Sequence, residues 1–85
     1  MTADKRIERL IFRSGHRGTR EMDLLLGSFA AAHLRGFTPA QLDAYEALLQ
    51  CGDPDLYEWI TGKTQPPPAY DNEVTRMLCQ HRFKA

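Results

Sequence analysis

Apolar side chains recur every three or four positions along most of this chain, which is the period of an α-helix with one buried face. The first stripe consists of Ile7, Leu10 and Ile11. Asp4 precedes the stripe as a candidate N-cap, and Ser14-Gly15 follows it as a stop signal. The pattern therefore predicts a short first helix.

The second stripe is the longest and the most apolar. It predicts a helix from about Thr19 to Leu34, with Gly36 as its C-terminal stop. The stripe consists of Met22, Leu25, Leu26, Phe29 and His33 and is widened by Leu24, Ala30 and Leu34. We expect this helix to be central and buried on more than one side.

Two further helices are expected to begin with a cap followed by proline. Thr38, Pro39 and Gln41 form a predicted capping box, and that helix should end near Cys51-Gly52. The next helix is expected to use Asp53 as its N-cap, with Pro54 in the first position and Gly62 at the end (residues 53–62).

Prolines interrupt the segment KTQPPPAY (residues 63–70), which is predicted to be a non-helical connector. Asp71 should cap a last helix with Val74, Met77, Leu78 and His81 along one side, and the terminal RFKA should fray. No strand-like alternation or internal repeat is visible in the sequence. The predicted fold is all-α, a single domain over residues 1–85 built as a compact bundle of five short helices.

Length and composition limit the possible functions. With 85 residues, of which 42% are hydrophobic and 26% charged, the chain can form one domain with a small core. A deep active-site cavity is not expected, and no catalytic motif stands out, so we do not expect an enzyme. Cys51 and Cys79 have no CxxC spacing and are interpreted as buried thiols in a reducing compartment.

The ends of the chain and its apolar runs bear on localisation. No apolar run has the length of a membrane span, and no secretory signal peptide is recognisable. An arginine- and serine-rich leader is also missing from the sequence, which favours a bacterial cytoplasmic protein.

The net charge of zero is unevenly distributed. Residues 1–20 carry a net charge of +4, whereas residues 38–62 carry −5 and contain no lysine or arginine. Such a two-sided molecule suits a protein partner better than a polyphosphate. We therefore expect no nucleic acid partner, although a helical nucleic-acid binder using the basic end remains a candidate.

The segment HRGTRE (residues 16–21) is the first candidate site. If Gly18 is the N-cap of the second helix, Glu21 occupies the third helical position, where a carboxylate complements the helix dipole. Arg17 and Arg20 oppose that dipole, so local helix stability does not explain them. A partner-binding patch and a plain solvated helix end are both consistent with this pattern.

The segment CGDPDLYEWI (residues 51–60) is the second. Trp59 is best explained as an anchor of the core, whereas Tyr57 and Glu58 could face a partner. The spacing of Cys79 and His81 points the two side chains apart on a helix, and no second pair completes a tetrahedral site, so no metal is expected.

Together, the two segments resemble a known family. Arg17-Gly18-x-x-Glu21 entering an apolar helix, followed by Cys51-x-Asp53-Pro54-Asp55-Leu56-Tyr57-x-Trp59-Ile60, is similar to the RGxxE-containing FAD assembly factors of succinate dehydrogenase, the SdhE type. The resemblance covers nearly the whole chain. It implies a helical chaperone that promotes covalent attachment of FAD to the flavoprotein subunit of succinate dehydrogenase, and often of fumarate reductase.

The resemblance also implies where the partner binds. The RGxxE motif is the part of the family held to engage the flavoprotein, and it matches Arg17, Gly18 and Glu21 here. From the two candidate segments themselves we add His16, Arg20 and Tyr57 to the expected partner-binding residues. The histidine that bonds to a flavin methyl carbon would belong to the flavoprotein. The factor itself is expected to bind no cofactor and to be a monomer when free.

Two other functions stay open on the sequence. The same family was once assigned as the antitoxin half of a toxin–antitoxin pair, and the basic end leaves the nucleic-acid binder as a third candidate.

Overall fold

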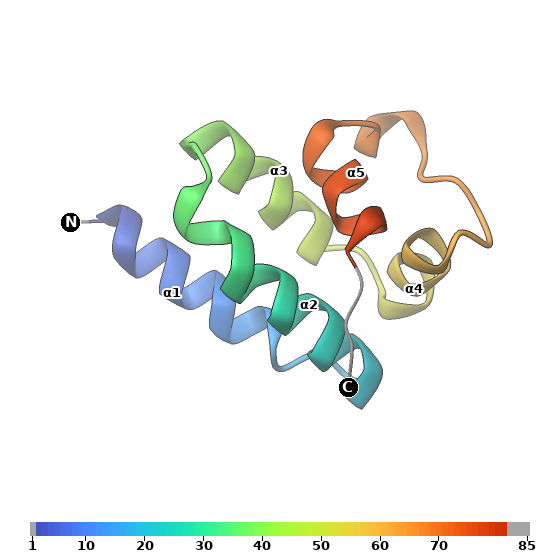
Figure 1. Ribbon diagram of the computed structural model, residues 1–85, viewed down its shortest axis with the longest axis horizontal. Helices are drawn as coiled ribbons and strands as arrows, with labels where there is room; N and C mark the ends of the chain where they lie inside the picture. The colour runs from blue at the N-terminus through green and yellow to red at the C-terminus, as the bar shows by residue number, and fades with distance from the viewer. Residues whose placement is uncertain (1, 82–85) are drawn as a thin grey trace.

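The computed structural model describes residues 2–81, and within them the chain is all α-helical, which confirms the predicted fold class. Five α-helices and two single-turn 3₁₀ helices make up this part of the chain (Figure 1). The α-helices are α1 (Thr2–Ser14), α2 (Arg20–His33), α3 (Pro39–Leu49), α4 (Asp53–Thr61) and α5 (Glu73–Gln80). The 3₁₀ helices are η1 (Leu34–Gly36) and η2 (Pro68–Tyr70).

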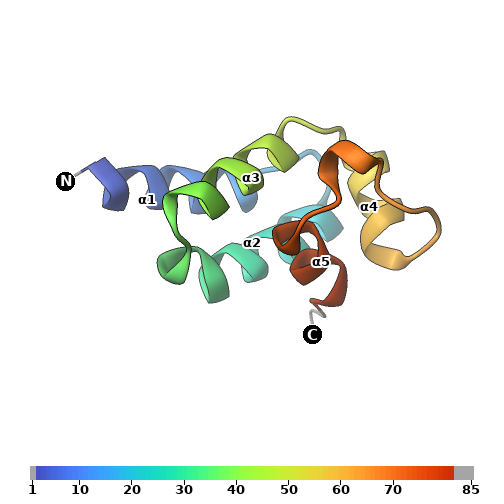
Figure 2. The same cartoon turned by 90° about the horizontal axis from the view of Figure 1, so that it is seen from above.

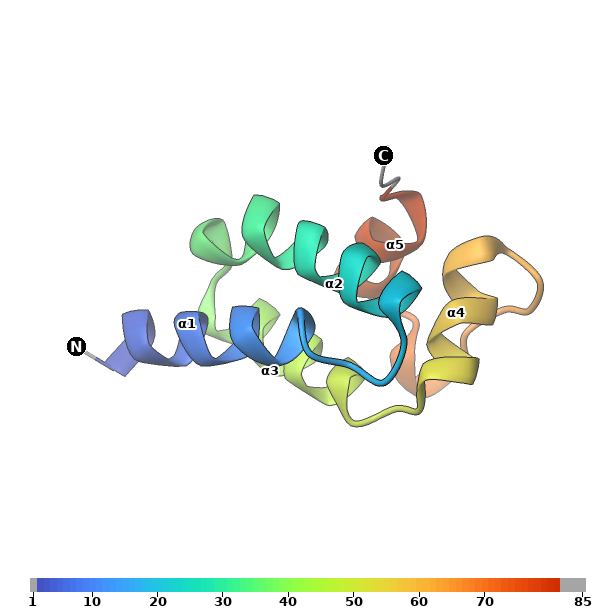
Figure 3. The same cartoon turned by 90° about the horizontal axis from the view of Figure 1, so that it is seen from below.

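The helices form two groups along the long axis of the molecule. α1 and α2 lie side by side and run in opposite directions, and this is the most extensive helix pairing in the fold (Figures 1 and 3). α3 packs on α1 and extends to the other end, where α5 contacts both α3 and α4 (Figure 2). The fold measures 39 × 29 × 20 Å. α4, which contains most of the second candidate segment (residues 51–60), lies at the end of the molecule away from the start of α1 (Figure 1).

A single apolar core runs through all five helices. Phe29 and Tyr45 form its centre, with stacked rings whose centroids lie 5.6 Å apart, and both side chains are fully buried. Burial of apolar area on this scale is the main stabilising contribution in so small a domain. The buried apolar residues are Ile7, Leu10, Met22, Leu26, Phe29, Ala30, Leu34, Leu42, Tyr45, Leu48, Leu49, Leu56, Trp59, Ile60, Val74 and Leu78.

Most of the predicted core positions are confirmed, with some exceptions. Trp59 is buried and lies against Tyr70, as expected of a core anchor. Leu24 was expected to widen the buried stripe of α2 but is 41% exposed, because α2 packs on α1 with its other side. Cys51 and Cys79 are both half-buried rather than buried.

The capping box at the start of α3 is confirmed in full. The Thr38 side chain accepts a hydrogen bond from the Gln41 N–H at 3.2 Å, and the Gln41 side chain accepts one from the Thr38 N–H at 2.8 Å. At the end of α4, Gly62 adopts the left-handed conformation with φ of 83°, which confirms it as the stop signal.

The other predicted N-caps are wrong. α1 begins at Thr2, so Asp4 lies inside its first turn. Thr19 rather than Gly18 caps α2, because the Thr19 hydroxyl accepts from the Met22 N–H. Gly52 occupies the N-cap position of α4, and Asp53 directs its carboxylate to another part of the chain.

At the start of α5, Asn72 is the cap in place of Asp71, since the Asn72 side chain accepts from the Thr75 N–H and Asp71 pairs with Arg76. The connector over residues 63–70 was predicted to be non-helical, but its last three residues form the single-turn 3₁₀ helix η2. The predicted fraying of RFKA concerns residues outside the described part of the chain. Over residues 2–81, the helices are too short and too polar to cross a membrane.

Candidate functional site

The two sequence motifs meet in space through Arg17. Its guanidinium lies against the junction between α3 and α4 and makes three hydrogen bonds there. Arg17 Nε donates to Asp53 Oδ1, Nη1 to the Leu49 carbonyl and Nη2 to the Cys51 carbonyl, each at 2.8 Å. The Arg17 side chain is only 13% exposed and that of Asp53 18%. We call this set of contacts the Arg17 clamp.

Helix electrostatics explain why a cation is stable at this place. The Leu49 and Cys51 carbonyls lie at the C-terminal end of α3, where carbonyl groups lack partners within the helix and a cation is favoured. Asp53 lies in the first turn of α4, where a carboxylate is favoured. The position of Arg17 in the sequence suggested that it opposes the dipole of α2. In the structure its guanidinium instead lies at the ends of α3 and α4. It neutralises the end of one helix and pairs with the anion at the start of the next.

Gly18 is part of the same arrangement. Its N–H donates to Asp53 Oδ2 at 3.1 Å, and a Cβ atom added at this position would lie 3.3 Å from that oxygen. The Arg17 backbone N–H donates to the Asp23 carboxylate on α2. The loop between α1 and α2 is thus held from α4 and from α2 at once, and the absence of a side chain at residue 18 leaves room for Asp53.

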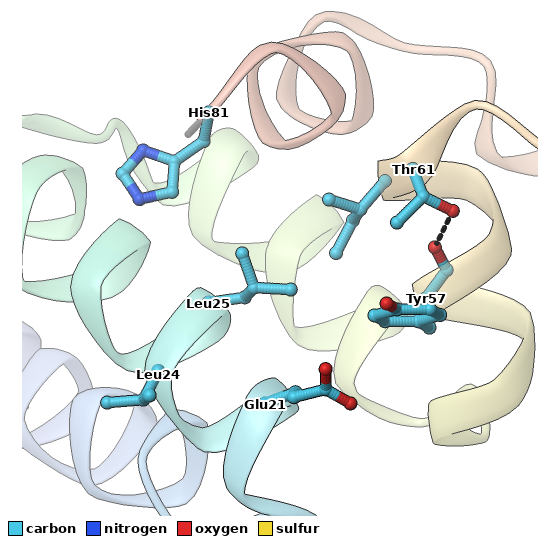
Figure 4. A pocket seen from close by; sticks show the side chains of 7 residues that line it. Glu21, Leu24, Leu25, Tyr57, Thr61 and His81 are labelled. Atoms are coloured by element: carbon cyan, nitrogen blue, oxygen red, sulfur yellow. Dashed lines mark hydrogen bonds between the residues drawn. The ribbon is translucent and has the colours of Figure 1, made fainter. Parts of the chain in front are cut away.

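Glu21 and Tyr57 lie on opposite sides of a neighbouring groove. Glu21 is exposed in the first turn of α2, and Tyr57 is half-buried on α4. Figure 4 shows the Glu21 carboxylate directed toward the Tyr57 ring, and the side chain of Leu25, also on α2, lying between Glu21 and His81. The groove offers about 440 Å³ and is lined by Glu21, Leu24, Leu25, Tyr57, Ile60, Thr61 and His81.

The far end of this groove is also well defined. His81 is hydrogen-bonded through Nε2 to the Ser28 hydroxyl at 2.8 Å, and Thr61 donates to the Tyr57 carbonyl at 2.7 Å. The walls of the groove are consequently set by contacts within the bundle. An acidic group at one end and apolar side chains along its length suit a partner segment that is both basic and apolar.

His16 and Arg20 lie on the exposed surface beside the clamp. The His16 ring stacks on Phe12, with ring centroids 4.0 Å apart, and its Nδ1 is 2.7 Å from the Phe12 carbonyl. Phe12 is 62% exposed, the most exposed large apolar side chain of the described residues. Of the six predicted partner-binding residues, the structure brings Arg17 and Gly18 into the clamp and places Glu21 and Tyr57 on the groove. Whether the six bind a partner stays a prediction.

Sequence patterns missed the role of Asp53. We interpreted it as a local helix cap, whereas it accepts two hydrogen bonds from the loop that precedes α2. A signal was present, because an arginine next to a predicted helix N-terminus is expected to find an acceptor elsewhere, and all charged residues of the segment 38–62 are acidic. The residues 2–81 contain no group of three or more histidine, cysteine, aspartate or glutamate side chains placed to hold a metal ion.

Comparison with known proteins finds several similar chains. The succinate dehydrogenase assembly factor 2-B, mitochondrial, of Drosophila persimilis is 44% identical over 80 residues, which cover 92% of this chain and 51% of that protein. Succinate dehydrogenase assembly factor 2, mitochondrial, of Dictyostelium discoideum is 40% identical over 78 residues (92% and 55%). The protein of the same name from Candida glabrata is 52% identical over 67 residues (76% and 44%). The chain spans about half the length of these relatives.

These relatives correct the expected localisation. They are named as mitochondrial proteins and come from eukaryotes, so the expectation of a bacterial cytoplasmic protein is wrong. That expectation depended on whether a leader is recognisable in the first residues of the sequence. Because this chain spans about half the length of these relatives, its first residues do not show whether the protein has a leader sequence.

A family model gives the assignment. The model described as the flavinator of succinate dehydrogenase matches residues 8–82, a range that includes both the RGxxE motif and the segment around Asp53 and Tyr57. The match therefore extends over the clamp and both sides of the groove. This chain belongs to the family of succinate dehydrogenase flavinators.

Proposed function

We propose that this chain is an assembly factor that binds the flavoprotein subunit of succinate dehydrogenase and promotes covalent attachment of FAD to it, without being an enzyme itself. One observation carries the proposal. Residues 16–21 and 51–60, which both lie within the range matched by the family model, contact each other through Arg17 and Asp53 and border a shared groove.

The surface we assign to the flavoprotein contains exposed Glu21 and Arg20 on α2, exposed His16 before α2, and Tyr57 across the groove. Residues 38–62 contribute no basic side chain to it. The matching surface of the flavoprotein should therefore present a basic side chain to Glu21 and apolar side chains to Leu25 and Ile60. Charge-assisted hydrogen bonds of this kind are stronger than neutral ones and select the orientation of the partner.

FAD is the substrate of the reaction and ends on the partner. In the family chemistry, a flavin methyl group loses a proton and its carbon bonds to a histidine nitrogen of the flavoprotein, which loses its own proton, while the electron pair from the broken C–H bond reduces the isoalloxazine ring. This chain would contribute by holding the flavoprotein in the geometry in which that histidine and the flavin meet. Holding reacting groups in place is worth several kcal/mol, roughly 7–11 in well-oriented model reactions, so a binding protein can accelerate the step without a catalytic residue.

The proposal extends to the flavoprotein of fumarate reductase and to a monomeric factor that binds no cofactor of its own. The antitoxin and nucleic-acid alternatives receive no support from the relatives, which are named for succinate dehydrogenase assembly. The acidic segment around α4 also disfavours a polyphosphate ligand next to the Arg17 clamp.

The test is in-gel flavin fluorescence of the denatured flavoprotein, prepared with the wild-type factor, without it, and with Glu21→Ala. Fluorescence that survives denaturation reports covalent flavin. We expect a strong signal with the wild type, a weak one without the factor and a reduced one with Glu21→Ala. Glu8→Ala, an exposed glutamate on α1 away from the groove, is the matched control and should behave as the wild type. Equal fluorescence in all samples would refute the proposed function.

A further inference from the structure

The Arg17 clamp lies directly beside the Glu21–Tyr57 end of the groove. Asp53 and Tyr57 are four residues apart on α4, so they share one face of the helix about one turn apart. A small hollow is lined by Thr19, Glu21, Met22, Asp53, Pro54 and Tyr57, which shows that Asp53, Glu21 and Tyr57 border the same space. Movement of the start of α4 would therefore change the spacing between Glu21 and Tyr57.

The helix packing makes the clamp important for this spacing. α2 packs mainly on α1, whereas α4 packs mainly on α5, so the two sides of the groove belong to different parts of the bundle. Asp53 connects the two parts by accepting from both Arg17 and Gly18, immediately before α2 begins. Asp23 completes the connection by accepting from the Arg17 N–H.

We propose that Arg17 and Asp53 are positioning residues, which set the spacing of Glu21 and Tyr57 for flavoprotein binding while Arg17 itself does not touch the partner. This inference rests on the proposed function. It changes the role of the family motif, because the arginine of RGxxE acts inside the factor and the glutamate acts outside it. Gly18 then leaves room for the Asp53 carboxylate.

The state of the Arg17 side chain supports this division. Nε, Nη1 and Nη2 all donate to acceptors within the chain, and the side chain is largely covered. Two of the five guanidinium N–H groups are not used in these bonds, but the side chain is only 13% exposed, so a partner has little access to them. Engaging Arg17 fully would require breaking the three bonds and would leave two carbonyl groups and one Asp53 oxygen without their donor. Glu21 is exposed and needs no such exchange.

The experiment measures the Kd of the factor for the isolated flavoprotein subunit of succinate dehydrogenase by titration calorimetry. The variants are Arg17→Gln and Asp53→Asn. Asparagine keeps the size of Asp53 but cannot accept from both Arg17 and Gly18. Arg6→Gln is the matched control, because Arg6 also ties two helices, through Asp43 at 2.6 Å and Glu46 at 2.9 Å, but on the far side of the fold.

We expect about a tenfold weaker Kd for both clamp variants, the size of a typical coupling between contacting groups, and an unchanged Kd for Arg6→Gln. Unfolding curves measured in parallel identify the folded fraction of each variant. If Arg17→Gln does not fold, Arg17→Lys replaces it, since lysine can still bond to Asp53 but cannot make the three-way contact. An intermediate Kd is expected for that variant.

A double variant separates positioning from direct contact. If Arg17 acts through the groove, Arg17→Gln should have little further effect on Kd in a Glu21→Ala background. The inference is overturned if the tenfold effect persists unchanged in that background, which indicates direct contact, or if the clamp variants bind as the wild type does. If the wild-type factor itself does not bind the flavoprotein, the proposed function fails and the inference fails with it.

Discussion

The hydroxyl groups of Ser14 and Tyr45 lie 2.6 Å apart in the centre of the fold, and both residues are completely buried. Ser14 donates its hydroxyl proton to the Leu10 carbonyl at 2.7 Å, which leaves Tyr45 as the donor to Ser14. This contact joins the last residue of α1 to α3. It fixes the chain just before the loop that carries Arg17 and Gly18.

Removal of this hydrogen bond should destabilise the bundle modestly. We expect Tyr45→Phe to lower the free energy of unfolding by ~1 kcal/mol, because the ring still fills its place against Phe29 and Ser14 keeps its bond to Leu10. Urea denaturation followed by circular dichroism measures the change. Tyr57→Phe is the control, and its ring at the groove should leave stability within about 0.5 kcal/mol of the wild type. Equal losses in the two variants would mean that the Ser14 contact is not responsible.

The same tyrosine should make stability sensitive to alkaline pH. Burial raises the pKa of Tyr45 from 10.0 to about 12, with the Ser14 hydrogen bond acting in the opposite direction. Tyrosine is neutral below its pKa. Because the pKa of Tyr45 is higher in the folded state, the folded state holds the hydroxyl proton more tightly than the unfolded state does. The stabilisation is therefore complete below pH 10 and is lost as the pH rises through about 12.

We expect the wild type to lose ~2 kcal/mol more than Tyr45→Phe over this pH range. Unfolding free energies measured at several alkaline pH values give the difference directly, because the other titrating groups are common to both proteins. Parallel pH profiles for the two proteins would show that Tyr45 ionises equally in the folded and unfolded states.

Two substitutions at Gly18 should separate the effect of an added side chain on stability from its effect on partner binding. The backbone of Gly18 does not have a positive φ, so alanine is compatible with it, and its Cβ would need Asp53 to move by only a few tenths of an ångström. We expect Gly18→Ala to change the free energy of unfolding by less than ~1 kcal/mol. Gly18→Arg should retain a folded bundle but lose flavoprotein binding, since its guanidinium competes with Arg17 for Asp53.

Circular dichroism and a binding titration measure the two properties of these Gly18 variants separately. Normal binding by Gly18→Arg, or its complete unfolding, would contradict this account.

Gly62 provides a test of backbone conformation that is independent of binding. Its φ of 83° ends α4, and an alanine there would be held in the left-handed region at a cost of ~1–2 kcal/mol. Gly36→Ala is the control, because no atom lies within 4 Å of the added Cβ and its φ is not positive. Thermal or urea unfolding should show a clear loss for residue 62 and little change for residue 36. A loss at residue 62 no larger than at residue 36 would rule out a strained cap.

The local features of this fold could be predicted from the sequence with good accuracy. Apolar periodicity located all five helices, and the Thr38–Gln41 capping box and the Gly62 stop were predicted at the right residues. These features depend on contacts three or four residues apart, so the neighbouring residues contain the information. The N-caps at Gly18, Asp53 and Asp71 were each misplaced by one residue, because several adjacent residues could act as caps and only side-chain geometry selects one of them.

The candidate site depended on tertiary structure for its central relationship. The sequence by itself determined that Arg17, Gly18, Glu21 and Tyr57 are present in the pattern of a flavinator and that stability of the second helix alone does not explain Arg17. It could not determine that Asp53, 36 residues after Arg17 and 35 after Gly18, accepts from both. No local rule relates residues at that separation. Only the packing of α1, α2 and α3 brings the loop before α2 to the charged ends of α3 and α4, where the fields of the two helices favour the guanidinium and the carboxylate.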